Sequence, residues 1–376
     1  MSQGTPTIIH LPDQGSHDWV EAYLTDVLAA KDPQTLDAYA RILLDFARWL
    51  PRQTGCDQFH PADMTRTALK TYFDAKKAEK KPLSRAELEG KVASLRGSER
   101  PLHYAPTTLS RMKVSLSGFA DWLIEQGVLA VNPVRGITIP RMAARPPRQL
   151  SPKQRLALRN VVERATNPIV RRGQVIPGDL RGAAIFALGY YAGLRVSDVS
   201  HLLVRNTHVG PKVGWIRAGH KREIYRDLDL LNEARGPLHA YLEKGERKGG
   251  SAYVFTSQRV KQTLPVGDED GWRLTEDGIH QWFQEVRLKA SVKEAELIDD
   301  ITFHDLRHDF GHRLRGQGWS LEEVAYYLGH VNADGTPSIQ TTARYTQVGR
   351  EHIKVKLRQI RDVEGSEQDG DAWGER

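Results

Sequence analysis

The sequence predicts a mainly α-helical protein with a small β-sheet, folded as two domains. The first half contains two long segments with apolar residues at helical spacing. The second half mixes apolar helical segments with one pair of short β-prone segments. The chain has 376 residues, and a single hydrophobic core rarely grows beyond about 250–300 residues. Two domains are therefore expected.

The N-terminal domain is expected to be helical and to span residues 16–135, after a flexible leader at 1–15 that is rich in Gly, Pro and Gln. Its first long helix has apolar residues three or four apart, which share one helical face: Leu36, Tyr39, Leu43, Phe46 and Leu50. A second helix repeats the pattern: Leu109, Met112, Leu116, Phe119 and Leu123. The opposite face of this second helix carries Arg111 and Lys113.

A basic, proline-rich stretch at residues 136–152 has no helical period and is expected to link the two domains. Ser151 before Pro152 is a start signal for the first helix of the second domain, which we place at 153–362. The tail at 363–376 is acidic and rich in glycine, so we expect it to be disordered.

The second domain combines helices with a hairpin. Residues 179–202 are apolar and helical, and residues 213–230 contain two β-prone stretches around a polar turn, which is typical of a hairpin. A helix after Thr275 has this threonine as its N-cap. Another helix begins with a capping box formed by Ser320 and Glu323.

The composition limits the class of protein. Lys and Arg number 54 against 47 Asp and Glu, for a net charge of +7, which permits a polyanionic partner without requiring one. The single cysteine, Cys56, cannot form an internal disulfide or a thiolate metal cluster. No apolar run is long enough for a membrane span and no secretory signal is present, so we expect an intracellular protein without membrane contact.

Three histidines and three arginines lie in the short segment from Ile301 to Ser320, which is predicted to be helical. His304 and His308 are four residues apart and share a helical face, as in a zinc-binding HExxH pattern with Asp in place of Glu. A catalytic zinc ion needs a third protein ligand, and His312, four residues further along a straight helix, cannot converge on the same ion. We therefore expect no metal, and we expect His308 and His312 to be ordinary helical histidines.

The same segment also suits a phosphate. His304 and Arg307 are three residues apart and share a face. The planar guanidinium of arginine matches phosphate oxygens, and histidine can donate to a further oxygen. One such pair occurs by chance, so the interpretation depends on whether the chain supplies the rest of a phosphoryl-transfer site.

Four motifs in a fixed order supply it. The segments "YAGLRVSDVSHL", "HDLRH", "YYLGH" and "TTARYTQV" together resemble the tyrosine recombinase (phage integrase) family over residues 150–350. The N-terminal helical half resembles the core-binding domain of this family, which clamps DNA. The resemblance therefore implies a helical core-binding domain followed by a mixed α/β catalytic domain.

The resemblance also implies catalytic roles for particular residues. The matched catalytic positions are Arg195, His304, Arg307, His330 and the nucleophile Tyr345. Tyr345 lies fifteen positions after His330, which is longer than is usual in the family, and the additional residues are expected to form a loop. Tyr326 and Tyr327 are alternative nucleophiles by proximity, and we expect both to pack in the core instead.

Two further positions are implied by the family. Asp198, one helical turn after Arg195, matches the acid that holds this arginine in place. The family also uses a lysine on a β-hairpin turn, for which Lys221 fits best and Arg222 is the rival.

These residue types suit DNA strand transfer. A tyrosine hydroxyl has a pKa near 10 and is protonated at neutral pH, so it needs help to attack phosphorus. Two arginines around the phosphate stabilise the developing charge and favour the phenolate. The resemblance implies that His304 accepts or relays the tyrosine proton, that His330 hydrogen-bonds the phosphate, and that Lys221 protonates the leaving 5′ oxygen. The energy of the phosphodiester is kept in a 3′-phosphotyrosine, so neither ATP nor any other cofactor is expected.

The expected partner is double-stranded DNA with specific recombination sites. Six basic residues are candidate DNA contacts: Arg111, Lys113, Arg141, Arg145, Arg148 and Arg222. The family implies a homotetramer on two paired sites, with the segment after Tyr345 as a helix exchanged between subunits, and accessory DNA-bending proteins. It also implies a cytoplasmic, nucleoid-associated enzyme of integration, excision, resolution or transposition, as in mobile elements.

Two other functions stay open from the sequence. A type IB topoisomerase-like nicking-closing enzyme would relax DNA without exchanging strands. A catalytically silent, sequence-specific DNA-binding protein would keep the fold without the reaction, although every catalytic position carries a competent side chain.

Overall fold

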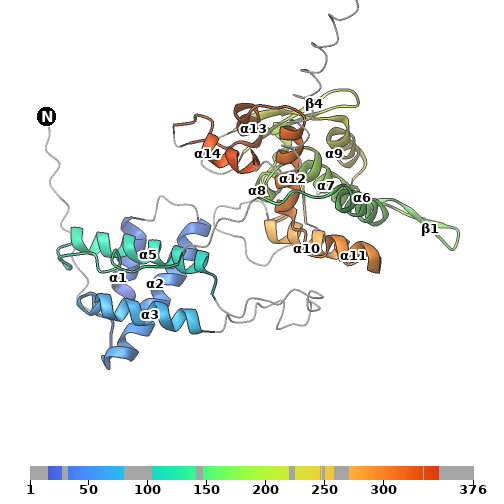
Figure 1. The fold of residues 1–376 in the computed structure, drawn as a ribbon. Coiled ribbons are helices and arrows are strands. Elements are labelled where there is room, and N and C mark those ends of the chain that lie inside the picture. Colours follow the sequence, from blue (N-terminus) through green and yellow to red (C-terminus); the bar gives the residue numbers. More distant parts are fainter. Residues whose placement is uncertain are drawn as a thin grey trace, which may run out of the picture. The chain divides into compact units, whose positions relative to one another are not determined.

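The computed structural model describes residues 16–27, 33–79, 104–140, 147–219, 225–245, 247, 250–257, 271–332 and 334–346. The chain divides into two compact units, Met1–Ala144 and Arg145–Arg376. Figure 1 shows the helices and strands of each unit. The described residues confirm a mainly helical fold with small sheets. None of the helices in the described ranges has the length and hydropathy that a membrane crossing requires.

The first unit is a helical bundle around an aromatic core. Its helices are α1 (Ser16–Asp26), α2 (Pro33–Thr54), the 3₁₀ helix η1 (Pro61–Asp63), α3 (Arg66–Ala78) and α5 (Pro106–Glu125). The apolar faces predicted for α2 and α5 both lie in this core, and the ring of Phe46 packs edge-on against that of Tyr72.

The boundary between the units falls inside the stretch expected to be the linker. Ile137 and Ile139 are buried in the core of the first unit. Leu150 is buried in the core of the second. Both ends of the expected linker are therefore fastened to the unit that they adjoin.

The second unit contains nearly all of the functional candidates. The elements described in its first half are α6 (Pro152–Thr166), β1 (Ile169–Arg171), β2 (Gln174–Ile176), α7 (Leu180–Tyr191), α8 (Val196–Ser200), η2 (Val204–Asn206), β3 (Thr207–Val209), β4 (Gly214–Ala218) and β5 (Arg226–Asp229). Those in its second half are α9 (Asn232–Lys244), α10 (Glu276–Arg287), α11 (Val292–Ile298), α12 (Phe303–Gly316), α13 (Leu321–Leu328), α14 (Ile339–Thr342) and η4 (Ala343–Thr346).

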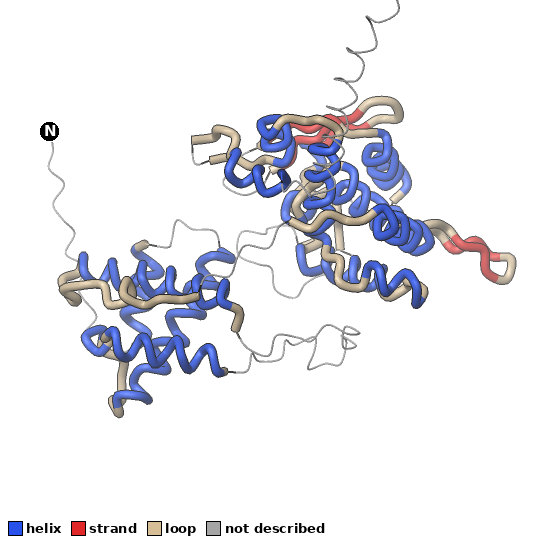
Figure 2. Tube along the Cα trace, in the orientation of Figure 1, coloured by secondary structure: helices blue, strands red, loops and turns tan. Residues whose placement is uncertain are grey.

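The predicted hairpin is confirmed as β4 and β5, which pair antiparallel with Ala218 opposite Arg226. Strand β3 adds to its other edge, giving the order β3-β4-β5. A second, two-stranded ribbon of β1 and β2 was not foreseen, and its strands are coloured red in Figure 2 apart from the larger sheet. Its four aliphatic side chains are exposed, which removes the alternation that identifies a half-buried strand.

The segment predicted as one helix over 179–202 is two helices, α7 and α8, with a turn at Gly193 between them. Gly193 has a φ of +61°, and a Cβ atom there would lie 2.5 Å from Cδ1 of Phe310. The left-handed backbone and the close packing both require glycine. The break places Arg195 at the N-terminus of α8 instead of within a helix.

Helix α12 runs through the middle of the second unit, beside α7 (Figure 1). Its apolar residues follow a helical spacing and are all buried: Phe303, Leu306, Phe310 and Leu314. The adjoining face of the same helix carries His304, Arg307 and His308. A central helix with one apolar face therefore fixes the position of the HxxR pair.

Candidate active site

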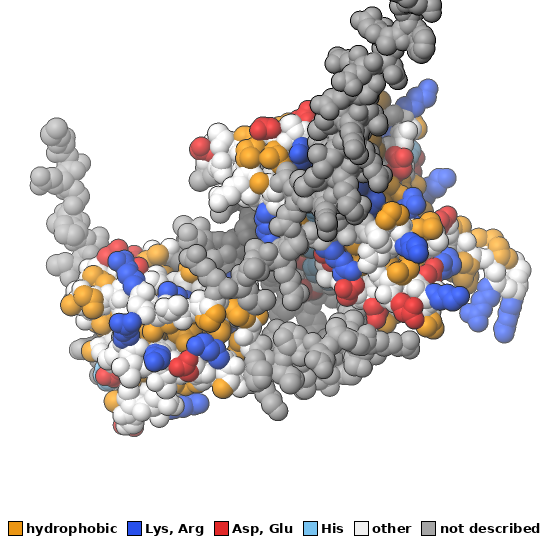
Figure 3. All heavy atoms as spheres, viewed as in Figure 1, with side chains coloured by type: hydrophobic (Ala, Val, Ile, Leu, Met, Phe, Trp, Pro, Cys, Tyr) orange, Lys and Arg blue, Asp and Glu red, His pale blue; other side chains and the backbone are white. Residues whose placement is uncertain are grey.

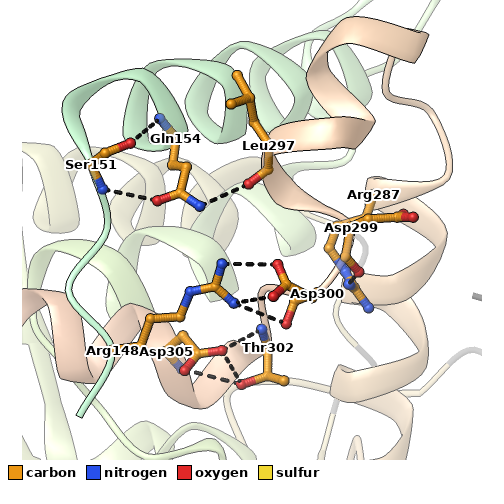
Figure 4. Close-up of polar contacts among 9 residues, drawn as sticks. All are labelled: Arg148, Ser151, Gln154, Arg287, Leu297, Asp299, Asp300, Thr302 and Asp305. Atoms are coloured by element: carbon orange, nitrogen blue, oxygen red, sulfur yellow. Dashed lines mark hydrogen bonds and ion pairs between the residues drawn. The ribbon is translucent and has the colours of Figure 1, made fainter. Parts of the chain in front are cut away.

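The N-terminus of α12 is held by a capping box that also decides the role of Asp305. Oγ1 of Thr302 accepts a hydrogen bond from the amide of Asp305, and the Asp305 carboxylate accepts from the amide of Thr302 at 2.8 Å (Figure 4). In a zinc-type HDxxH site this carboxylate would act as a base. Here Asp305 caps the helix instead. The cap fixes where α12 begins and so places His304 in the first turn of the helix.

Arg307 is the most deeply buried of the site cations, at 1% exposure. Its Nη1 donates to the carbonyl of Gly193 at 2.7 Å, and its Nη2 donates to the carbonyl of Leu328. One guanidinium thus joins the turn before Arg195 to the end of α13. Both carbonyls thereby accept a hydrogen bond from a charged donor, which is stronger than one from a neutral donor.

Arg195 binds the next carbonyl along the same turn. Its Nη2 donates to the carbonyl of Gly329 at 3.0 Å. The carboxylate of Asp198 accepts from the backbone amide of Arg195 at 3.3 Å, whereas Nη1 of the Arg195 side chain is 3.9 Å from it. Arg195 and Arg307 therefore converge on neighbouring carbonyls at the C-terminus of α13, directly before His330.

His330 lies on the turn that both arginines bind. Gly329 ends α13 with a φ of +64°, and His330 follows with its ring buried. Burial first, and then the charges of Arg307 and Arg195, lower the pKa of His330 to about 3. The imidazole is therefore neutral at pH 7. Its Nδ1 lies 3.0 Å from Oγ1 of Thr342 in α14.

His304 and His308 form a second imidazole pair on α12. Their rings meet edge to face with centroids 4.3 Å apart. Partial desolvation, followed by the charge of Arg307, lowers the pKa of His304. Burial and the neighbouring His304 lower the pKa of His308 to about 4. These shifts favour the neutral form of both rings.

The zinc interpretation requires a third ligand beside these imidazoles. Within the part of the chain that the structure describes, no group of three or more His, Cys, Asp or Glu side chains is placed to hold an ion. His312 makes a different contact, since its Nε2 lies 3.0 Å from the carbonyl of Pro147. His312 is thus a satisfied helical histidine, as expected.

Tyr345 lies in η4, which packs against α12 and α14. The backbone of the predicted nucleophile is thereby placed beside the helix of His304 and Arg307. The side chain of Tyr345 lies outside what the structure describes. Arg344, the residue before it, is close enough to His308 to contribute to its lowered pKa.

The additional residues between His330 and Tyr345 form a closed excursion. Val331 and Pro337 are joined by an antiparallel bridge, and the amide of Ser338 donates to the carbonyl of His330 at 2.6 Å. The chain therefore leaves at His330 and returns to the same point. The longer spacing does not carry Tyr345 away from α12, because α14 and η4 continue from the base of the excursion.

The alternative tyrosines occupy different environments. Tyr327 packs against Phe310 and Trp319, and its hydroxyl donates to the carbonyl of Asp229. Burial raises the pKa of Tyr327 to about 12. Its expected packing role is confirmed. The same expectation is wrong for Tyr326, which is 62% exposed because it faces outward from α13.

The expected DNA contacts are distributed unevenly. Lys221, Arg222, Arg141 and Arg145 lie outside the described residues. Arg111 is exposed on α5 and Lys113 is half-buried there. Figure 3 shows cationic, acidic and apolar side chains mixed on the viewed face of the first unit, without one cationic stripe.

Arg148 has a partner inside the protein. Its guanidinium forms an ion pair with Asp300 at 2.8 Å, two residues before the cap of α12 (Figure 4). Arg148 lowers the pKa of the Asp300 carboxyl. In this state its charge fastens the chain before α6 to the start of the HxxR helix.

Arg226 lies near the site and was not predicted from the sequence as a functional residue. Arg226, at the start of β5, is 8% exposed and forms an ion pair with Asp198. The strand pattern carried the signal, because Arg226, Leu228 and Leu230 alternate on one face of the strand and both leucines are buried. A charged residue in phase with buried leucines points inward.

The sequence resembles those of known proteins over most of its length. The sequence profile of the phage integrase family matches residues 159–352. The tyrosine recombinase XerC of Chromohalobacter salexigens is 26% identical over 339 residues, covering 90% of this chain and 93% of that protein. The tyrosine recombinase XerD of Ralstonia nicotianae is 27% identical over 361 residues, covering 94% and 97%.

Solved structures share the fold. The XerH recombinase bound to its difH substrate aligns with a TM-score of 0.57 and 14% identity, over 92% of this chain and 85% of that one. A lambda integrase dimer bound to a core site aligns with a TM-score of 0.55 and 14% identity, over 88% and 94%. The family profile and the XerC and XerD relatives identify an enzyme of the tyrosine site-specific recombinase type. The chain belongs to the phage integrase family.

Proposed function

We propose that this enzyme cleaves and rejoins DNA strands through a 3′-phosphotyrosine intermediate formed by Tyr345, without a metal ion or ATP. The observation that carries the proposal is the convergence of Arg195 and Arg307 on the carbonyls of Gly329 and Leu328. Both arginines also act electrostatically on His304 and His330. Four side chains suited to phosphoryl transfer therefore lie within electrostatic range of one another, and η4 packs beside them.

The arginines bind the scissile phosphate in this account. Charge spreads over the non-bridging oxygens during attack, and fixed guanidinium groups stabilise it. Arg195 is 36% exposed and reaches the phosphate directly. Arg307 is buried in the DNA-free state, so DNA binding must open the site above it before it contacts the phosphate.

The histidines move the proton in this account. His304 is exposed, and its lowered pKa leaves it neutral and able to accept the tyrosine proton. His330 is neutral in the DNA-free state, and the negative charge of a bound phosphate favours its protonated, donating form. Lys221 protonates the leaving 5′ oxygen, with Arg222 as the rival. Both assignments rest on the sequence pattern around the β4–β5 turn.

The substrate is double-stranded DNA with specific sites, on which four copies of the chain assemble in the cytoplasm at the nucleoid. The DNA complexes of XerH and lambda integrase support DNA as the partner. The helical first unit closes over the duplex with Arg111 and Lys113 among its contacts. The segment after Tyr345 is exchanged between subunits, accessory bending proteins assist, and the reaction serves integration, excision, resolution or transposition.

A plasmid assay tests the proposed function. Supercoiled plasmids carrying two copies of the DNA that flanks the gene, or none, are incubated with the enzyme in EDTA. We expect deletion or inversion products from the first plasmid only. Relaxation of both plasmids without exchange would indicate a topoisomerase-like enzyme. Tight binding without cleavage would indicate a silent DNA-binding protein.

A further inference from the structure

Arg226 joins two parts of the site that are far apart in the sequence. It begins β5, and its Nη2 lies 3.3 Å from the Asp198 carboxylate in α8. Its Nε donates to the carbonyl of Tyr327 in α13 at 2.9 Å. A single planar guanidinium therefore contacts both the helix that follows Arg195 and the helix that precedes His330.

Asp198 needs a cation, because it is a carboxylate with only 4% of its side chain exposed. Among the residues that the structure describes, Arg195 and Arg226 pair with it. Nη1 of Arg195 is 3.9 Å away, at the edge of ion-pair range, and Nη2 of Arg226 is closer at 3.3 Å. Arg226 is therefore the main counter-ion of Asp198. Because Arg195 is only weakly paired with Asp198, its guanidinium stays available to bind a phosphate.

Arg226 also packs against Gly329, in the turn before His330. A Cβ atom added at Gly329 would lie 2.6 Å from Nη1 of Arg226. The guanidinium of Arg226 thus occupies the space that a side chain at Gly329 would need. The carbonyl of the same Gly329 accepts a hydrogen bond from Arg195. Burial lowers the pKa of Arg226, and Asp198 opposes this shift, as expected for a buried cation held by its carboxylate.

We propose that Arg226 is a positioning residue for the strand-transfer reaction. It neutralises Asp198 and supports the Gly329 turn, so that Arg195 and His330 keep the spacing that a phosphate requires. The proposal rests on the proposed function for its effect on cleavage. The pairing of Arg226 with Asp198 can be tested without any activity.

The test uses four variants of the full chain. R226M removes the charge and keeps much of the volume, and R226K keeps the charge but loses the planar fork that reaches two partners at once. D198N/R226M removes both charges, while the new side-chain amide keeps an oxygen that can accept from the backbone amide of Arg195. R217M is the matched control, since Arg217 pairs with Asp227 on the same hairpin and both side chains are about half exposed.

The first measurement is thermal unfolding, which does not depend on activity. We expect R226M to melt below the wild type and D198N/R226M to melt above R226M, because the double variant leaves no unpaired buried carboxylate. R217M should melt close to the wild type, since exposed ion pairs contribute little. If the double variant melts no higher than R226M, Arg226 is not the counter-ion and the proposal is overturned.

The second measurement is single-turnover cleavage of nicked duplexes, taken from the flanks of the gene and from a random-sequence pool captured covalently by the wild type. We expect R226M to cleave about 10–100-fold more slowly, with D198N/R226M recovering part of the rate. R226K should fall between R226M and the wild type. DNA affinity and its salt dependence should match those of R217M, because Arg226 does not bind the DNA itself.

The outcomes separate the two claims. Cleavage by R226M as fast as by R217M overturns the positioning role. If R226M does not fold at the assay temperature, R226K decides, and a wild-type rate for R226K overturns the role of the fork. Failure of the wild type to capture any duplex contradicts the proposed function, while the unfolding comparison still decides the pairing.

Discussion

His330 is tied to the segment that leads to Tyr345 through Thr342. Nδ1 of His330 lies 3.0 Å from Oγ1 of Thr342, and this hydroxyl donates its own hydrogen to the carbonyl of Ser338. A hydroxyl has one hydrogen, so Thr342 accepts from Nδ1–H of the neutral ring. The tautomer of His330 is thereby fixed, with Nε2 as the acceptor. Loss of the hydrogen bond between His330 and Thr342 should therefore lower the cleavage rate.

Replacement of Thr342 by valine removes this acceptor with little change in volume. We expect T342V to lose about 1–2 kcal/mol of stability, because Nδ1 of His330 loses a buried partner. The cleavage rate should fall about tenfold or more, as for other residues that orient a catalytic ring. The measurement is single-turnover cleavage beside T341V, which alters an exposed neighbour in the same way. Equal rates for the two variants would contradict the role of Thr342.

A side chain at Gly329 should displace Arg226, which packs against this glycine, and Arg195, which donates to its carbonyl. Gly329 has a φ of +64°, and a Cβ atom there would lie 2.6 Å from Nη1 of Arg226. We expect G329A to lose about 1–3 kcal/mol of stability and to cleave more slowly. A Cβ atom at Gly316 would meet no atom within 4 Å apart from its chain neighbours and the backbone of its own helix, so G316A should be neutral or slightly stabilising. Thermal unfolding and cleavage of the pair check this, and a G329A protein as stable as G316A would refute it.

The buried histidines make stability depend on pH. The pKa values of His308 and His330 are about 4 and about 3, below the unfolded value near 6.5. Between these values the unfolded state binds more protons, so the free energy of unfolding falls as the pH drops below about 6.5. H308Q removes one such group and should flatten the loss between pH 6.5 and 4. Thermal unfolding across this range is the check, and identical slopes for H308Q and wild type would exclude the effect.

DNA binding should weaken steeply with salt, because phosphate contacts release counterions. Arg111 is exposed on α5, and R111A should lower the slope of log affinity against log salt by about one. Arg41 in the same unit pairs with Asp37, so R41A should leave the slope unchanged. Fluorescence anisotropy over a salt series measures both. An unchanged slope for R111A would remove Arg111 from the phosphate contacts.

Much of the fold followed from local patterns in the sequence. The apolar faces of α2 and α5 and the caps at Ser151, Thr275 and Ser320 are confirmed, because spacing and capping depend on residues close together in the chain. The hairpin of β4 and β5 followed from alternation and a polar turn.

Other features depend on contacts between distant residues and left little trace in the sequence. The break at Gly193 is required by packing against Phe310, more than a hundred residues later. The closure of the chain between His330 and Ser338 depends on a backbone hydrogen bond that no side chain announces. The pairing of Arg226 with Asp198 could not be predicted either, because only the folded chain brings these two residues together.

The most direct test of the central claim is covalent capture of DNA by Tyr345. Wild type and Y345F are incubated in EDTA with nicked duplexes from the flanks of the gene, and denaturing gels show any protein–DNA adduct. We predict an adduct with wild type and none with Y345F. An adduct that persists in Y345F would contradict the assignment of the nucleophile, and the exposed Tyr326 would then be the next tyrosine to replace.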